Sequence, residues 1–143
     1  MKLKDNIPAL AVSAFLLLGV GMVVSRFITP SADAVPMVVK VPDLTPTAQS
    51  GKRAFDDNCV ACHGTNGAGT DQGPPLVHDI YNPGHHADVS FLAAVQRGVP
   101  RHHWNFGDMQ AQPQVSRRQI EVIVRYVREL QEANGIFYKP HKM

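Results

Sequence analysis

A stripe of apolar residues near the carboxy-terminal end is the clearest periodic feature of the sequence. Its members recur at the spacing of one helical face: Ile120, Ile123, Val124, Val127 and Leu130. Ser116 followed by Gln119 matches a capping box at the start of this stripe. Asn134 and Gly135 are typical of a left-handed cap at its end. The pattern predicts an amphipathic helix between Ser116 and Asn134.

Charged residues fill the positions between the apolar ones. Glu121 lies four residues before Arg125, and Arg128 lies four residues before Glu132. Side chains at this spacing are neighbours on a helix surface. We therefore expect both pairs to lie on the solvent-facing side of the helix.

A second helix is predicted earlier in the chain from its start signals. Thr45 is a favourable N-cap residue, and Pro46 suits the first helical position. The helix should pass through Gly51 and Phe55 and end at about Asn58. It would bring the two cysteines that follow to a defined position at its end.

A third, shorter helix is expected over residues 89–97, with Asp88 as its cap and Gly98 at its end. Stretches rich in Gly and Pro over 64–83 and 100–113 predict loops. No segment shows the alternation of apolar and polar residues that is typical of strands. The fold class is therefore expected to be all-α, with three or four short helices.

The amino-terminal end carries an apolar run, and residues 8–24 contain no charge. A helix of 17–20 residues spans about 26–30 Å, close to the thickness of the hydrocarbon core of a membrane. Lys2 and Lys4 precede the run, which predicts a cytoplasmic tail with the rest of the chain outside. We interpret residues 1–28 as a membrane anchor, with lipid contact through residues 7–27.

A cleaved signal peptide is the alternative for this segment, because Ala32-Asp33-Ala34 fits a small-residue cleavage site. The apolar run is longer than the usual signal core, and the site lies far beyond its end. Both interpretations export the domain that follows. We expect a single-pass protein of the inner membrane, with this domain in the periplasm or on the outer face.

The predicted organisation continues with a Pro-rich linker over residues 29–44, a folded domain over 45–135 and a tail over 136–143. Prolines at this density favour extended chain over helix. The linker would be a tether that lets the domain move between partners in one membrane. Met37 lies in this tether and is not expected to be a ligand.

Composition and charge argue against one class of function, nucleic-acid binding, and the helix content indicates a bound cofactor. The 143 residues are 44% hydrophobic and 18% charged, with a formal charge of +2 and interspersed signs. Nucleic-acid binding, which requires clustered Lys and Arg, is not expected. The predicted helices cover only about half of the domain, and long loops in small domains usually wrap something. A large cofactor at the centre would supply the missing core.

The sequence Cys59-Val60-Ala61-Cys62-His63 is a C-x-x-C-H motif, the signature of covalent attachment of a c-type haem. Two thiols at this spacing can each add to a vinyl group of one porphyrin, and His63 can then ligate the iron. Two alternatives remain. A thioredoxin-like dithiol needs a βαβ pattern, and a zinc site needs further Cys or His ligands from elsewhere.

The domain resembles class I cytochromes c over residues 45–135. Gly51 and Phe55 match the family's amino-terminal helix, and Tyr126 matches the aromatic residue that packs across it. Gly73-Pro74-Pro75-Leu76 matches the G-P-x-L motif. The resemblance implies a class I cytochrome c fold around one haem, in which the Pro74 carbonyl accepts the Nδ1 hydrogen of His63.

The resemblance also implies that a Met in the loop before the last helix is the second axial ligand. Met109 is the only Met between the haem motif and that helix. A thioether opposite His raises the reduction potential and leaves the iron no open site. His102 or His103 could replace Met109 as the ligand. Trp104 is expected to donate its indole N–H to a haem propionate, as aromatic residues do in similar proteins.

Other polar residues of these loops are not assigned as ligands of the haem iron. His78 and the pair His85-His86 are expected to be solvated loop residues rather than a second metal site. Arg97 or Arg101 could pair with a propionate, and the sequence does not choose between them.

We therefore expect a one-electron carrier with His63 and Met109 as iron ligands, and not an enzyme. Its partners would be membrane redox complexes that serve as electron donor and acceptor. One alternative is a fixed cytochrome subunit of a larger oxidase, dehydrogenase or photosynthetic complex. Another is a sensor or enzyme with an open haem, which an occupied Met109 position argues against.

Overall fold

The computed structural model describes residues 14–22, 24 and 37–140. The chain divides into two compact units, Met1–Ser31 and Ala32–Met143. In the first unit, residues 14–22 and 24 are helical, and their large apolar side chains are exposed. Within the described residues, no helix combines the length and apolar character needed to cross a membrane. The rest of the predicted anchor, the cleavage site and linker residues 29–36 lie outside the described residues.

The second unit is built around two long helices. Helix α2, Pro46–Asn58, begins as predicted, since the Thr45 side chain accepts a hydrogen bond from the Ala48 amide and Pro46 follows it. Helix α5, Arg117–Ala133, begins with the predicted capping box of Ser116 and Gln119. All five residues of its predicted apolar stripe are buried. Asn134 is its C-cap, and Gly135 follows with φ of 80°.

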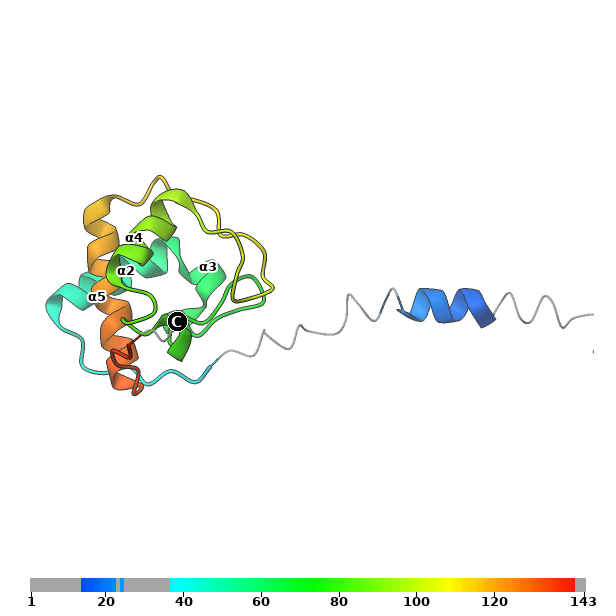
Figure 1. Cartoon of the computed structure of the whole chain (residues 1–143), viewed down its shortest axis with the longest axis horizontal. Helices are drawn as coiled ribbons and strands as arrows, with labels where there is room; N and C mark the ends of the chain where they lie inside the picture. Colours follow the sequence, from blue (N-terminus) through cyan, green and yellow to red (C-terminus); the bar gives the residue numbers. More distant parts are fainter. Residues whose placement is uncertain (1–13, 23, 25–36, 141–143) are drawn as a thin grey trace, which may run out of the picture. The chain divides into compact units, whose positions relative to one another are not determined.

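Helices α2 and α5 lie side by side (Figure 1). Their close contact is at Gly51. A Cβ atom at Gly51 would lie 1.9 Å from the Val122 carbonyl oxygen and 2.9 Å from Tyr126 Cβ. One turn further on, the rings of Phe55 and Tyr126 meet edge to face, with centroids 5.6 Å apart. Both rings are fully buried. The expected packing of the aromatic residue against the amino-terminal helix is confirmed.

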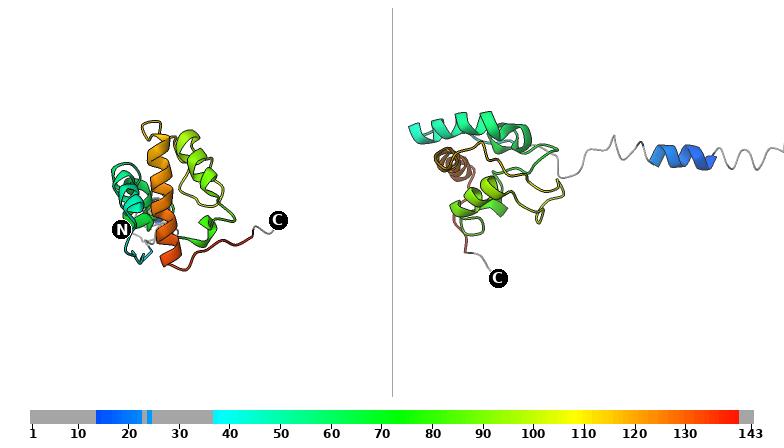
Figure 2. Two further views of the ribbon diagram at one scale, coloured as in Figure 1. Left: turned by 90° about the vertical axis from the view of Figure 1, so that its left-hand side faces the viewer. Right: turned by 90° about the horizontal axis from the view of Figure 1, so that it is seen from above.

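Helix α4, Asp88–Arg97, lies on the other side of α5 from α2 (Figure 2). Its N-cap is Ala87, so the prediction that Asp88 is the cap was wrong by one residue. Asp88 already belongs to the helix, and its carboxylate accepts a hydrogen bond from Arg128 Nε at 2.8 Å. Gly98 ends the helix as predicted.

Of the four charged residues of α5 that were expected on the solvent-facing side, Glu121, Arg125 and Glu132 are exposed as predicted, whereas Arg128 is buried. The observed pairs join Arg117 to Glu121, Arg125 to Glu129, and Arg128 to Asp88. Arg128 and Glu129 are only 8% exposed, so they do not lie on the solvent-facing side. Arg128 NH1 and NH2 also donate to the backbone carbonyls of Tyr81 and His86. Arg128 therefore ties α5 to the start of α4 and to the turn before it.

The predicted loops contain short turns of helix. Helix α3, Val60–His63, follows α2 directly, and two 3-10 turns follow it, η3 over Thr65–Gly67 and η4 over Asp79–Tyr81. The described residues form no β-strand. They contain one isolated β-bridge, between Val99 and Met109. The all-α prediction is confirmed for this part of the chain.

Segments on both sides of the predicted domain pack against it. The Met37 amide donates to the Ala68 carbonyl at 3.0 Å, and Lys40 exchanges two hydrogen bonds with the Asn134 side chain. At the other end, Ile136 is buried, and Lys139 pairs with Asp79. Residues 37–44, predicted as linker, and 136–140, predicted as tail, therefore contact the folded core.

Candidate haem site

The cysteine motif is held on one turn of helix at the end of α2. Cys59 is the C-cap of α2, and its amide donates to the Phe55 carbonyl at 2.7 Å. The amides of Cys62 and His63 both donate to the Cys59 carbonyl, at 3.2 and 2.9 Å. Gly64, with φ of 72°, then ends the turn. Both thiols and the imidazole therefore come from a single helical turn fixed to the buried Phe55.

The ring of His63 is oriented by the chain itself. Its Nδ1 lies 2.9 Å from the Pro74 carbonyl oxygen. Because a carbonyl only accepts, Nδ1 carries the hydrogen, and the lone pair lies on Nε2. The described residues contain no side-chain nitrogen or oxygen that is both buried and without a partner. Nε2 hydrogen-bonds to none of them, so it is not completely enclosed by protein atoms.

Protonation also favours a ligand role for His63. Burial lowers the pKa of the ring, and this effect exceeds the rise caused by the hydrogen bond with the Pro74 carbonyl. The ring is therefore neutral at pH 7, which is the form that binds a metal ion. A hydrogen bond at the other nitrogen fixes the ring and raises its basicity as a ligand.

The loop that carries Pro74 is folded tightly onto the motif. Thr70 Oγ1 donates to the Cys62 carbonyl at 2.5 Å, and the Gly69 amide donates to the His63 carbonyl at 2.7 Å. A Cβ atom at Gly73 would lie 2.9 Å from the Cys62 carbonyl oxygen. The glycine of the G-P-x-L motif is thus required for the close approach that places the Pro74 carbonyl beside His63.

The two alternatives for the cysteines find no support in this geometry. Neither cysteine forms a disulfide. Burial raises the pKa of the Cys59 thiol to about 11, and the nearby Cys62 thiol contributes a smaller part of this rise. A reactive dithiol needs a lowered thiol pKa, so the environment of Cys59 is unsuited to that chemistry. Among the described residues, the one group that could hold a metal ion through three or more side chains contains neither cysteine nor His63.

Met109 lies at the base of a closed loop. Its amide and carbonyl pair with Val99, at 2.9 and 3.0 Å. Gly98, with φ of 75°, permits this pairing, because a Cβ atom there would lie 2.5 Å from the Met109 carbonyl oxygen. Asp108 accepts a hydrogen bond from the Arg101 amide inside the loop. The side chain of Met109 is partly buried against the core.

Apolar side chains that are only partly buried complete the candidate site. Such residues on α3, η4, α4 and the Met109 loop pack against the core and retain exposed area: Val60, Tyr81, Phe91, Leu92 and Met109. Two thiols, an oriented imidazole and a thioether are the donors that a covalently held haem requires. His63 and Met109 would hold its iron, and Cys59 and Cys62 would hold the porphyrin.

Trp104 has a protein partner that the sequence did not predict. Its indole N–H donates to the Tyr81 hydroxyl at 3.1 Å, and its ring contacts His78 edge to face. Burial raises the pKa of Tyr81 to about 12, an effect larger than the opposing one of the Trp104 hydrogen bond. A propionate acceptor for Trp104 stays a prediction, and it would have to replace Tyr81 in this role.

The histidines of the loops behave differently from the expectation of solvated residues. His85 and His86 are half-buried, and both contact the ring of His103. His78 lies outside this group, and its Nδ1 accepts a hydrogen bond from the Ile80 amide. The grouping joins residues far apart in the sequence, so spacing alone gave no signal of it.

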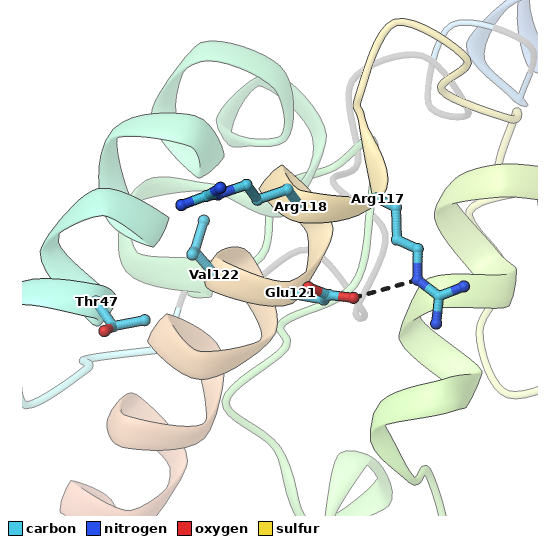
Figure 3. A pocket seen from close by; sticks show the side chains of 5 residues that line it. All are labelled: Thr47, Arg117, Arg118, Glu121 and Val122. Atoms are coloured by element: carbon cyan, nitrogen blue, oxygen red, sulfur yellow. Dashed lines mark hydrogen bonds and ion pairs between the residues drawn. The ribbon is translucent and has the colours of Figure 1, made fainter.

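A surface hollow between the starts of α2 and α5 is separate from the cysteine motif. It is lined by Thr47 and by the first turns of α5, where Arg117 Nε pairs with Glu121 at 3.2 Å (Figure 3). Its lining includes none of the candidate haem ligands. The hollow is open to solvent, and we assign it no role in the chemistry.

Comparison with known proteins agrees with the site. The family model for cytochrome c matches residues 48–131. The chain is 32% identical over 104 residues to the cbb3-type cytochrome c oxidase subunit CcoP of Rhodobacter capsulatus. The matched region covers 68% of this chain and 35% of that relative. The chain thus spans about a third of the relative's length. No solved structure gives a significant match. The chain belongs to the cytochrome c family and is a class I c-type cytochrome that carries haem c.

Proposed function

We propose that this cytochrome is a one-electron carrier in which His63 and Met109 are the two axial ligands of the haem iron. The observation that carries the proposal is the 2.9 Å contact between His63 Nδ1 and the Pro74 carbonyl, directly after the two cysteines. It directs the His63 lone pair to Nε2 and fixes the ring. When bound, the haem supplies an iron that gains or loses a single electron.

The chain's own residues determine what this iron can do. The Pro74 carbonyl orients His63, and the bridge between Val99 and Met109 fixes the backbone that presents the thioether. If His63 and Met109 both held the iron, no position on it would be left for a substrate, which suits a carrier rather than an enzyme.

We also propose that residues 7–27 anchor the protein in the inner membrane, with a single pass and with the haem domain in the periplasm or on the outer face. The uncharged run 8–24, preceded by Lys2 and Lys4, supports this orientation. So do the helical conformation and exposed apolar side chains of residues 14–22. Linker residues 29–36 would tether the domain near the membrane redox complexes that donate and accept its electrons.

A fixed subunit of an oxidase complex is the second candidate function. The similarity to the CcoP subunit of a cbb3-type oxidase favours it, although the match covers only about a third of that protein. Gentle extraction of the native membrane followed by size-exclusion chromatography distinguishes the two. A carrier elutes by itself, whereas a subunit elutes with haem-containing partners in fixed proportion.

The ligand assignment is tested by the reduction potential of Met109→Ala. Loss of the thioether should lower the potential, because a thioether opposite His favours the reduced iron. Met37→Ala is the matched control, since Met37 lies before α2 in the sequence and its side chain is exposed. An unchanged potential in Met109→Ala, or an equal fall in Met37→Ala, would overturn the assignment.

A further inference from the structure

Three histidines gather on the surface of the domain, separate from the haem ligands. His85 and His86 lie in the turn before α4, and His103 lies in the loop that leads to Met109. One ring nitrogen from each lies within 4.8 Å of the others. We call these three residues the histidine cluster. His85 and His86 are half-buried and His103 is exposed, so the cluster is open to a small ion.

The nitrogen spacing is close to that of a metal site. Nε2 of His85 and Nε2 of His103 lie 3.2 Å apart. Two imidazoles that bind one tetrahedral ion at about 2.05 Å place their nitrogens roughly 3.3 Å apart. This pair therefore already has the required separation. The third nitrogen reaches the same separation if its ring moves by about 1.5 Å or less.

The tautomers of two neighbouring rings are fixed in the form that a ligand needs. His86 Nδ1 lies 2.9 Å from the Ile80 carbonyl, so Nδ1 is the donor and Nε2 keeps its lone pair. His102, next to the cluster, makes the same contact with the Pro100 carbonyl at 2.9 Å. Metal-binding histidines are usually held by such a hydrogen bond at the other nitrogen.

His102 lies beside the cluster but outside the set of nitrogens that lie within 4.8 Å of one another, so it becomes a fourth ligand only if its ring moves. Its ring centroid lies 4.2 Å from that of His103 and 6.1 Å from that of His86. Protonation also affects metal binding, because a ring binds a metal ion in its neutral form. Burial lowers the pKa of His103, and the neighbouring imidazoles lower it further. The pKa of His86 is lowered too, by burial more than by its neighbours, including Arg128. The group contains no carboxylate, so its donor set is imidazole alone.

We propose that His85, His86 and His103, with His102 as a fourth ligand, bind one divalent transition-metal ion. Imidazole donors suit copper, zinc and nickel, whereas magnesium and calcium prefer oxygen. Copper(II) should bind most tightly and zinc(II) less so, following the usual order of divalent affinities. A bound ion would join the turn before α4 to the loop that carries Met109.

The test is isothermal titration calorimetry of the haem-loaded full chain with zinc chloride and copper(II) chloride, and with magnesium chloride as the negative control. The wild type should bind one zinc ion per chain and no magnesium. His86→Asn and His103→Asn should each weaken zinc binding by roughly tenfold or more, since even an outer-shell partner is worth that much. His103 is exposed, so its replacement should not affect folding.

The matched control is His78→Asn, which removes a nearby histidine outside the cluster. Asn can still accept the hydrogen bond from the Ile80 amide that His78 accepts. Zinc affinity in this variant should equal that of the wild type. The haem spectrum and the unfolding midpoint without metal confirm that each variant is folded. Absence of zinc binding, or binding that survives both cluster substitutions, would overturn the proposal, and neither result bears on haem ligation.

Discussion

Replacing Gly51 by Ala tests whether the contact between α2 and α5 sets the stability of the domain. The added methyl carbon would lie 1.9 Å from the Val122 carbonyl oxygen, 2.6 Å from its carbonyl carbon and 2.9 Å from Tyr126 Cβ. Two of these three neighbours are backbone atoms in the interior of a helix. They cannot rotate away as the end of a flexible side chain could, so the helices must separate.

The magnitude follows from two opposing effects. Ala stabilises a helix interior by about 1 kcal/mol relative to Gly. Overpacking a tight contact costs about 1–3 kcal/mol, and contacts this short belong at the upper end of that range. The net loss in the free energy of unfolding should be about 2 kcal/mol. For a domain of this size that corresponds to a fall of about 8–16 °C in the unfolding midpoint.

The assay is guanidinium unfolding of the haem-loaded protein, followed by helical circular dichroism. Asp57→Ala is the matched control, because Asp57 is an exposed residue of the same helix. Its stability should change by no more than about 0.5 kcal/mol. A Gly51→Ala protein as stable as the wild type, or more stable, would refute the close contact of α2 and α5.

Two other predictions concern the buried charges of α5. Burial raises the pKa of Glu129, but hydrogen bonds from Thr45 and Arg125 outweigh it and the net pKa is lowered. The resulting stabilisation is complete above the unfolded pKa of about 4.3 and is lost as pH falls through the folded pKa. Wild type and Glu129→Gln should therefore differ most in unfolding free energy near pH 7 and converge as the pH falls through the lowered folded pKa of Glu129. A difference independent of pH would contradict this. Arg128→Met should cost roughly 1–3 kcal/mol in guanidinium unfolding, because it removes one donor from each of the Tyr81 and His86 carbonyls. The Asp88 carboxylate, which also loses this donor, is exposed to water and adds little to the cost. A loss below about 1 kcal/mol would show that water replaces Arg128.

The features that the sequence predicted well are local. The starts of α2 and α5 depend on Thr45 and Ser116, whose side chains bond to amides within three residues. The haem motif occupies one helical turn, and its signal is contained in five consecutive residues. The contact of His63 with Pro74 was also predicted from a short motif, the G-P-x-L sequence, and this prediction did not require knowledge of the path of the loop.

The features that the sequence missed depend on segments far apart in the chain. Arg128 occupies a position that looks solvent-facing, and it is buried only because the turn before α4 presents carbonyls to it. The same turn brings His85 and His86 to His103, across the 16 intervening residues 87–102 of helix and loop. The hydrogen bond of Trp104 with Tyr81 has the same origin. No local pattern encodes these contacts, because they follow from how the loops close on the core.

Carbon monoxide binding tests the central claim, that His63 and Met109 fill both axial positions of the haem. The measurement is the absorbance difference spectrum of the purified, reduced, full-length protein with and without carbon monoxide. We expect no difference for the wild type and a clear difference for Met109→Ala, where the second axial position is open. Ready binding of carbon monoxide by the wild type would show an open or labile iron and would contradict the carrier function in favour of a sensor or an enzyme.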